Sequence, residues 1–378
     1  MARIVYALSG QGRGHTSRVL AMSAELRSRG HEIVFCCGGT AREILNEQGE
    51  AVIEVPALRQ VVHENKLQIV STLWQNAGSV CGQRSIVGDL ADQFRDFGPD
   101  LLITDFEAFS PKAARKLGVP TLSFNHQEIV TRTVYELPDR YRAHAFLTGL
   151  VIKLVAPKHP VHSLLTSFYF PPVKDPQTTT LVRPIIRREV MALQPSVGDH
   201  VLVYFNQTMG AEFVLEALRG AEANFVVYNF AAPSDPTSYP NITFKSASLD
   251  GFLSDLATCR AVICTAGFTL MSEALFLGKP TLVVPNEGIF EQTLNALFLC
   301  SEGLGQGVFG RELTSDDVHG FLNRLTSFSE RIRNRSGSGN IDAADCIERV
   351  LRDHGAFVAQ IPRRAYSREN GEAVLDHG

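Results

Sequence analysis

The chain has 378 residues, and its 44% hydrophobic and 20% charged residues are ordinary for a globular protein. At about 150 residues per domain, this length favours two domains. The formal net charge of -4 offers no excess of cations for binding nucleic acid. The seven cysteines form no CxxC pair and no cluster at zinc-ligand spacing, which predicts reduced thiols and no metal site.

The amino terminus begins directly with a strand pattern and a glycine-rich loop, without the features of a signal peptide. No apolar run approaches the roughly 20 residues that a membrane-spanning helix needs. The sequence therefore predicts a protein that is cytoplasmic or peripherally attached to a membrane.

The first half alternates short buried-type strands with amphipathic helices, a pattern typical of a parallel sheet covered on both faces. Apolar residues at helical spacing mark each helix, and runs rich in β-branched residues mark the strands. The predicted strands are 3–8, 32–37, 51–55, 101–104 and 121–124, and the predicted helices are 15–29, 40–48, 89–97 and 110–117.

The pattern weakens between Pro138 and Pro184, and a second alternation then begins. The fold class is therefore α/β, with two Rossmann-like, doubly wound parallel-sheet domains over residues 1–183 and 184–355 and a polar tail over 356–378. Doubly wound sheets bind ligands at the carboxyl ends of their strands, so we expect the site in a cleft between the domains. The second domain is predicted to have strands at 201–205, 225–230, 261–264 and 281–284 and helices at 212–219 and 249–258.

Residues 264–303 place small and polar residues at each junction between a predicted strand and a helix. Gly267 lies between a strand and a helix, so free N–H groups and the positive end of the helix dipole form an anion site there. Thr265 and Thr269 add hydroxyl donors, and Glu273 lies one turn beyond Thr269 on the same helix face. A carboxylate at that position suits ribose hydroxyls, and the alternative is a solvated helical glutamate.

Glu291 and Gln292 open the last helix of this stretch. An acid beside an amide can bind several sugar hydroxyls, because the acid accepts hydrogen bonds while the amide both accepts and donates them. The alternative is that the two side chains only cap the helix.

A second glycine-rich loop follows the first strand, where Gly10, Gly12, Arg13 and Gly14 lead into His15. A dinucleotide-binding loop of this kind needs an acidic residue at the end of the second strand. That strand ends in Phe-Cys-Cys-Gly-Gly, so the sequence disfavours a dehydrogenase.

The spacing of these residues in stretch 264–303 and in the loop before His15 resembles that in the GT-B glycosyltransferases. The resemblance is greatest to the peptidoglycan N-acetylglucosaminyltransferases and the UDP-glycosyltransferase superfamily. The resemblance spans nearly the whole chain and is most specific over residues 241–305. It implies a GT-B architecture with two domains facing across a cleft, the first binding the acceptor and the second the UDP-sugar donor. The tryptophan and histidine of the plant-type signature are absent here, so the likeness is to the bacterial branch.

The resemblance also implies roles for individual residues of the donor half. The turn at residues 266–269 and Arg187 would hold the diphosphate, Glu273 the ribose, and Glu291 with Gln292 the sugar. The alternative for Arg187 is an ordinary surface arginine of the linker. The implied donor-binding residues are Arg187, Asn206, Gln207, Thr208, Phe244, Thr265, Ala266, Gly267, Phe268, Thr269, Glu273, Glu291 and Gln292.

In the first domain, the resemblance implies that His15 is the general base for the acceptor hydroxyl and that Asp105 orients it. The alternatives are a packing residue at a helix start for His15 and a helix cap for Asp105. The implied acceptor-side residues are Gly10, Gly12, Arg13, Gly14 and His126, with Glu107 as a further candidate.

Residues 140–159 combine an apolar core with Arg140, Arg142, Lys153 and Lys158 and contain no acid. Such a segment can lie on an anionic membrane surface, which would place the protein at the inner face of the membrane and point to a lipid-linked acceptor. It can equally be an ordinary helix that covers the cleft.

The sequence thus predicts inverting, metal-independent transfer of a hexosyl group from a UDP-sugar to a small-molecule or lipid-linked acceptor, as in the synthesis of cell-envelope glycoconjugates. The UDP-sugar is a co-substrate, and no other cofactor is expected. Two alternatives stay open: a UDP-sugar 2-epimerase of the same fold, and a non-catalytic nucleotide-sugar-binding subunit.

Overall fold

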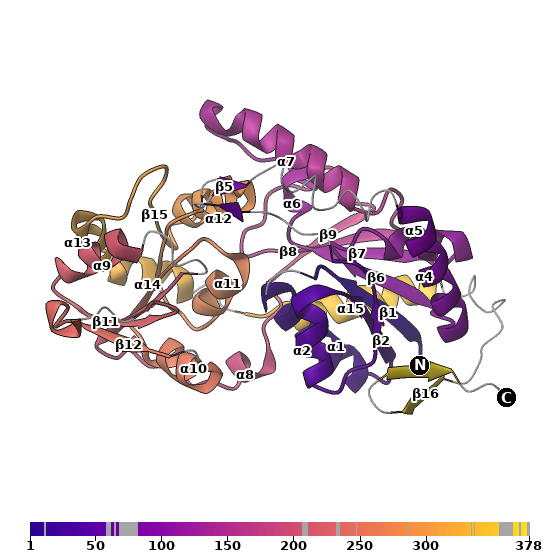
Figure 1. Ribbon diagram of the computed structural model, residues 1–378. Helices are drawn as coiled ribbons and strands as arrows, with labels where there is room; N and C mark the ends of the chain where they lie inside the picture. The colour runs from indigo at the N-terminus through magenta and orange to yellow at the C-terminus, as the bar shows by residue number, and fades with distance from the viewer. Residues whose placement is uncertain are drawn as a thin grey trace. The chain divides into compact units, whose positions relative to one another are not determined.

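The structure is a computed structural model that describes residues 1–10, 13–57, 62–63, 66–67, 82–205, 211–231, 235–246, 248–286, 288–333, 335, 337–354, 366–369 and 372–375 (Figure 1). The chain divides into two compact units. Unit 1 contains residues 1–61, 68–187 and 339–378, and unit 2 contains residues 62–67 and 188–338. Each unit has its own parallel sheet.

Unit 1 is built on a seven-stranded sheet with the order β3-β2-β1-β6-β7-β8-β9, and all neighbours are parallel. All five strands predicted from the first half are present. Strands β8 and β9 lie between Pro138 and Pro184, where no strand was predicted because the alternation of strand and helix patterns weakens there. The strands are β1 (Arg3–Leu8), β2 (Glu32–Cys37), β3 (Val52–Glu54), β6 (Leu101–Asp105), β7 (Thr121–Asn125), β8 (His162–Thr166) and β9 (Thr179–Val182).

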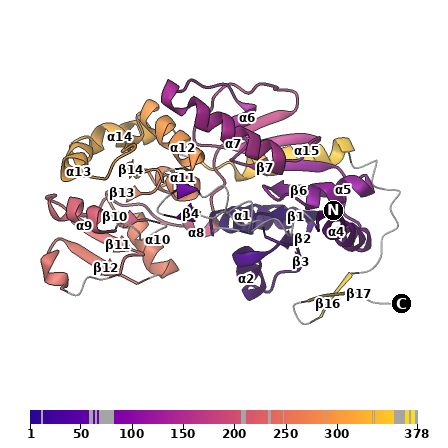
Figure 2. The ribbon, with the colours of Figure 1, turned by 45° about the horizontal axis from the view of Figure 1, so that its top comes forward.

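Side chains of β1 alternate between the two faces of this sheet, and both faces are covered by helices. Ile4, Tyr6 and Leu8 pack with α1 (Arg13–Ser28), α2 (Gly39–Glu47) and α15 (Asn340–His354). Val5 and Ala7 pack with α4 (Gln83–Phe97) and α5 (Ser110–Leu117). Both views show α7 (Arg142–Val155) against α6 (Ile129–Arg132), after a 3-10 turn at Asp139–Tyr141 (Figures 1 and 2).

Unit 2 contains a six-stranded parallel sheet with the order β12-β11-β10-β13-β14-β15. One face of this sheet packs with α9 and α13 around Val201, Val203 and Phe225. The strands are β10 (His200–Tyr204), β11 (Asn224–Tyr228), β12 (Ile242–Lys245), β13 (Ala261–Cys264), β14 (Thr281–Val283) and β15 (Gly305–Gly307). The helices are α8 (Arg188–Met191), α9 (Ala211–Arg219), α10 (Leu249–Thr258), α11 (Phe268–Phe276), α12 (Phe290–Ser301), α13 (Ser315–Leu322) and α14 (Leu325–Arg333), with a 3-10 turn at Pro236–Ser238.

Two antiparallel hairpins lie outside these sheets. Strand β4 (Val62–His63) pairs with β5 (Lys66–Leu67), and β16 (Tyr366–Glu369) pairs with β17 (Glu372–Leu375). The second hairpin lies in the predicted polar tail. The two parallel sheets confirm the predicted α/β class.

The last long helix, α15, belongs to unit 1, whereas the sequence grouped residues 184–355 as one domain. Its apolar face, including Ala343 and Ile347, is part of the core around β1. The Asn340 side chain holds the start of α15 against the end of the preceding unit 1 segment. Its Oδ1 accepts from Ile186 N, and its Nδ2 donates to Ile186 O, each at 2.9 Å. A sequence pattern marks an amphipathic helix but does not reveal which sheet the helix covers.

Each sheet has one place where the strand order reverses. In unit 1 the chain runs outward from β1 through β2 and β3 and returns at β6, beside β1. In unit 2 it runs outward from β10 through β11 and β12 and returns at β13, beside β10. Loops on either side of such a switch point diverge, which opens a crevice at the carboxyl ends of the strands. The candidate site residues of both units concentrate at these two positions.

Gly10 follows β1 and lies where no side chain fits. A Cβ atom there would lie 2.5 Å from Ala57 Cβ and 2.6 Å from the Gly38 carbonyl oxygen. Gly38 begins the turn after β2, and Gly39 has a φ of 56°, in the left-handed region that favours glycine. These glycines let the loops after β1 and β2 pack closely, so Gly10 has a structural role next to the site.

We predict that Gly10→Ala lowers the free energy of unfolding by roughly 1–3 kcal/mol, because the new methyl group overpacks the contact between these loops. Urea denaturation measures the change. Gly88→Ala is the matched control: it lies within α4 with open space around it, so alanine should stabilise the helix by up to about 1 kcal/mol. Unchanged stability in Gly10→Ala would contradict the close packing.

Candidate active site

The first candidate site lies at the switch point of unit 1. His15 lies in the first turn of α1, after β1, and Asp105 is the last residue of β6. His15 Nδ1 lies 2.9 Å from Asp105 Oδ1. The parallel pairing of β1 with β6, which aligns Leu8 with Asp105, brings these residues together although 90 positions separate them. The predicted histidine–aspartate pair is therefore present.

Arg18 is a third member of this cluster, and its place one turn after His15 was the only sequence signal that could have indicated it. Its Nε donates to Asp105 Oδ2 at 3.0 Å, and its Nη2 lies 2.7 Å from Oδ1 and 2.6 Å from Oδ2. Arg18 is 5% exposed and Asp105 is 0% exposed, so this ion pair is shielded from water. A planar guanidinium binding both carboxylate oxygens fixes the orientation of the Asp105 side chain.

The protonation state of the pair follows from its surroundings. Burial alone would raise the pKa of Asp105, but the positive charge of Arg18 and hydrogen bonds from His15 and Arg18 hold that pKa below its usual value. Asp105 is then an anion that only accepts hydrogen bonds, so we assign the His15 proton to Nδ1 and the acceptor lone pair to Nε2. Gln127 Nε2 lies 3.3 Å from His15 Nε2 and can donate to it. His15 retains 18% exposure of its side chain.

Phe106, directly after Asp105, has a strained backbone. Its φ is 59°, in the left-handed region, which a bulky residue seldom adopts. Such a conformation costs about 1–3 kcal/mol and occurs mostly at functional sites, where the surrounding structure maintains it. The other non-glycine residue with positive φ among the described residues is Asn229, a type that tolerates this region. Among the described residues, the end of β6 is therefore the place where a bulky residue has a strained backbone.

The other acceptor-side candidates have different surroundings. Gly14 lies in α1 beside His15, Arg13 begins the same helix, and Gly12 lies outside the described residues. His126 follows β7 but is 0% exposed, with its Nδ1 2.7 Å from the Thr166 carbonyl oxygen. Glu107 caps α5, because its carboxylate accepts from the N–H groups of Phe109 and Ser110. His126 and Glu107 are thus enclosed by the fold of unit 1.

The second candidate site lies at the switch point of unit 2, after β13. Gly267 is the N-cap of α11 in extended conformation, and no side chain caps the first turn. Thr265 and Ala266 are buried in the turn, and Phe268 and Thr269 begin the helix, so the predicted turn is present as a unit. The first N–H groups of a helix are donors without intrahelical partners, which makes this end of α11 suited to an anion.

The predicted sugar and ribose residues surround this turn. Glu273 lies in α11 and is only 3% exposed, which excludes the simple solvated glutamate. Glu291 is half-buried in the first turn of α12, and Gln292 Oε1 accepts from Asn286 N at 2.9 Å. Asn295, one turn later, donates to the Ala266 carbonyl oxygen at 3.2 Å and ties α12 to the turn after β13. The fold therefore gathers the residues of stretch 264–303.

The remaining donor candidates are less closely grouped. Arg187 is half-buried at the last position of unit 1, directly before the chain enters unit 2. Phe244 lies on β12 and packs edge-on against Tyr239, with ring centroids 6.3 Å apart. Asn206, Gln207 and Thr208, which follow β10, lie outside the described residues.

In the described part of the chain, no three His, Cys, Asp or Glu side chains are grouped so that they could hold a metal ion. Over the same residues, no helix has both the length and the apolar character needed to cross a membrane.

Two parallel-sheet units with candidate sites at both switch points define the class of GT-B glycosyltransferases, and solved structures of that class share the fold. The family model described as glycosyl transferase family 1 matches residues 2–326, so the chain belongs to that family. The predicted architecture and the predicted enzyme class, a glycosyltransferase, are thereby confirmed.

Relatives of known sequence and structure agree with this assignment. The chain is 25% identical over 338 residues to an uncharacterized glycosyltransferase of Methanosarcina mazei, which covers 80% of this chain and 85% of that protein. It is 22% identical over 382 residues, 94% of each protein, to the UDP-N-acetylglucosamine–N-acetylmuramyl-(pentapeptide) pyrophosphoryl-undecaprenol N-acetylglucosamine transferase of Brucella melitensis. The crystal structure of Acinetobacter baumannii MurG superposes with a TM-score of 0.62 at 16% identity, covering 92% of this chain and 100% of that one.

We predict that Arg18→Met destabilises unit 1 by roughly 3–5 kcal/mol near neutral pH, because it leaves the buried Asp105 carboxylate without its cation. Asp105 has a lowered pKa in the wild-type fold, so its stabilising effect is present above about pH 4 and is lost as the pH falls through the folded-state pKa. The difference between variant and wild type should therefore shrink below about pH 4.

Urea denaturation at several pH values measures both effects. Arg95→Met is the control, since the Arg95 side chain is 56% exposed in its pair with Asp92 and should contribute at most about 1 kcal/mol. The double variant Arg18→Met, Asp105→Asn should recover part of the loss. Equal stability of Arg18→Met and wild type near neutral pH would show that the ion pair does not form.

Proposed function

We propose that the chain transfers a hexosyl group from a UDP-sugar to an acceptor hydroxyl by a single displacement with inversion, without a metal ion. The observation that carries this proposal is the His15–Asp105 pair at the switch point of unit 1. A neutral imidazole with an acceptor Nε2 and a carboxylate behind Nδ1 has the arrangement of an oriented general base.

In the proposed reaction, the acceptor oxygen attacks the anomeric carbon while the bond from that carbon to the UDP oxygen breaks. The acceptor proton moves to His15 Nε2, and the resulting imidazolium is stabilised by the anionic Asp105. Arg18 contributes indirectly, because its two-pronged contact keeps Asp105 ionised and oriented. The diphosphate leaving group carries the negative charge that develops.

The donor half of the proposal uses the turn after β13. The uncapped first turn of α11 supplies N–H donors and a positive dipole end for the UDP diphosphate, with Arg187 as an added cation. Glu273 would accept hydrogen bonds from the ribose, and Glu291 and Gln292 would contact the sugar. Because these donors neutralise the diphosphate, no metal ion is needed in this scheme.

We expect UDP release from at least one donor when purified protein is tested against a panel of UDP-sugars with and without acceptors. His15→Ala should lower turnover by about 10²–10⁴-fold, because it removes the base, while leaving UDP affinity unchanged. Glu273→Ala should weaken UDP binding by about tenfold or more, because it removes a charged acceptor. Coupled UDP release and calorimetry measure the two effects.

His354→Ala, at the end of α15 and outside both sites, is the control for loss of a histidine. Full turnover in His15→Ala would refute the assignment of the base. Absence of UDP release from every donor would refute the transferase proposal for UDP-sugars.

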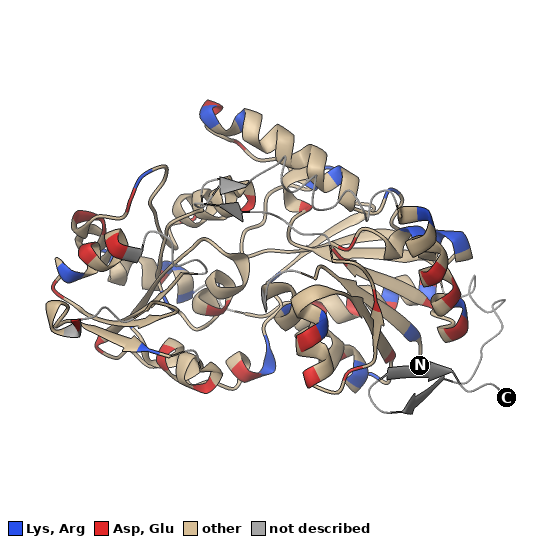
Figure 3. Ribbon diagram, in the orientation of Figure 1, with Lys and Arg blue, Asp and Glu red and all other residues tan. Residues whose placement is uncertain are grey.

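We further propose that the acceptor is lipid-linked and that α7 contacts the membrane that holds it. The Brucella melitensis relative carries a pyrophosphoryl-undecaprenol acceptor in its name. Five large apolar side chains of α7 are exposed, at spacings that place them on one face: Phe146 66%, Leu147 53%, Leu150 44%, Val151 50% and Leu154 79%. Figure 3 shows basic residues toward the two ends of the α7 ribbon with uncharged residues between them. The sequence between these ends is mainly apolar, as expected for an interfacial helix on anionic lipid.

We predict that the wild-type protein sediments with anionic lipid vesicles and that Phe146→Glu, Leu154→Glu weakens this binding by at least about tenfold, because each change adds a charge to the inserted face. The matched control is Leu249→Glu, Ile341→Glu, which alters two side chains that are 57% and 63% exposed on α10 and α15. Equal binding by both double variants would exclude α7 as the membrane contact.

A further inference from the structure

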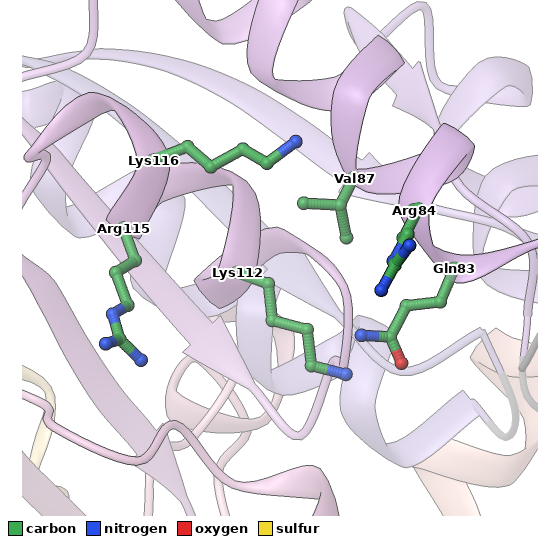
Figure 4. A pocket seen from close by; sticks show the side chains of 6 residues that line it. All are labelled: Gln83, Arg84, Val87, Lys112, Arg115 and Lys116. Carbon is green, nitrogen blue, oxygen red and sulfur yellow. The ribbon is translucent and has the colours of Figure 1, made fainter.

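A concave, cationic surface lies on unit 1 between the start of α4 and α5. The pocket has a volume of about 390 Å³ and is lined by Gln83, Arg84, Val87, Lys112, Arg115 and Lys116 (Figure 4). Lys112 and Lys116 extend from α5 toward Val87, Gln83 and Arg84 of α4 (Figure 4). None of these side chains belongs to the His15 cluster or to the donor turn.

The four cations of the pocket form no salt bridge with the residues that the structure describes. Among the described residues, no salt bridge involves Arg84, Lys112, Arg115 or Lys116, whereas Arg95 on the same helix α4 pairs with Asp92. The carboxylate that acts on Lys112 is Glu107, which is buried and already accepts hydrogen bonds from the backbone of α5. Like charges gathered around a hollow repel one another, and a bound anion would relieve that repulsion.

Two further features add positive potential to the pocket. Gln83 and Arg84 are the first residues of α4, whose N-cap Gly82 offers no side chain to the free N–H groups of the first turn. The second feature is the positive charge of Lys158, which lies near enough to Lys112 that, after partial burial, it contributes to lowering the pKa of Lys112. Lys158 follows α7, so the cationic pocket lies close to the end of the exposed apolar helix.

We propose that this pocket is a second anion site, separate from the donor site, that binds a terminal phosphate or diphosphate group. Lysine and arginine side chains with helix N–H groups are the donors that phosphate oxygens prefer, and Gln83 adds an amide donor. Val87 forms an apolar part of the wall, and it is only 5% exposed. The phosphate comes either from a lipid headgroup, which would join the pocket to the α7 surface, or from a free phosphorylated molecule.

The test compares two triple variants that each remove three positive charges. Arg84→Gln, Arg115→Gln, Lys116→Gln alters the exposed cations of the pocket. Arg42→Gln, Arg95→Gln, Arg219→Gln alters exposed cations elsewhere and is the control for net charge. Both are surface changes, so neither should prevent folding. All measurements are made with saturating UDP, which occupies the proposed donor site.

Calorimetry with inorganic pyrophosphate tests the free-phosphate source. Sedimentation with vesicles of phosphatidic acid, against phosphatidylglycerol vesicles of equal surface charge, tests the lipid source. Each removed cation should weaken binding about fivefold in the pocket variant. Weaker binding of pyrophosphate in that variant alone supports a free phosphate ligand. Loss of the preference for phosphatidic acid in that variant alone supports a headgroup ligand.

Indistinguishable behaviour of the two triple variants toward both probes would overturn the proposed anion site. The transferase proposal is separate from this result, because UDP release and UDP affinity depend on His15 and on the turn after β13.

Discussion

The fold of unit 1 depends on a positive charge beside the buried Asp105 carboxylate. Asp105 lies at the end of a central strand without solvent exposure, and a lone charge there would cost several kcal/mol. Arg18 supplies the neutralising charge and His15 a hydrogen bond, both from the first turns of α1. The packing of α1 on the sheet is thereby connected to the ionisation of Asp105. The same contacts orient the imidazole, so one ion-pair cluster serves both stability and the proposed base.

The two parallel sheets explain why the candidate residues gather in two places. All strands of a parallel sheet point the same way, so their carboxyl ends share an edge, and the reversal of strand order opens a crevice there. In unit 1 that edge holds His15 and Asp105, and in unit 2 it holds the turn at Gly267. Membership of glycosyl transferase family 1 agrees with this arrangement, because the family match covers both edges.

Away from these strand edges, unit 1 exposes an apolar helix face and a cationic pocket. The apolar face of α7 and the cationic pocket between α4 and α5 are both formed by side chains at the surface of unit 1. A contiguous exposed apolar patch often marks an interaction surface, and a hollow lined by charges of one sign attracts counterions. Both features lie outside the two candidate sites at the strand edges.

Local pattern determined most strands of the two sheets and the turn before α11, because strand period and glycine position are short-range signals. The pairing of His15 with Asp105 was an implication of the resemblance to GT-B glycosyltransferases, not of local pattern. Only the tertiary structure decided the rest. The structure shows that Arg18 binds Asp105 and that Gly10 lies in a close contact between two loops. It also shows that His126 is buried and that α15 packs in unit 1. These outcomes depend on which surfaces meet across long separations in sequence, and the free energy of burying or pairing a group is set by its neighbours in space.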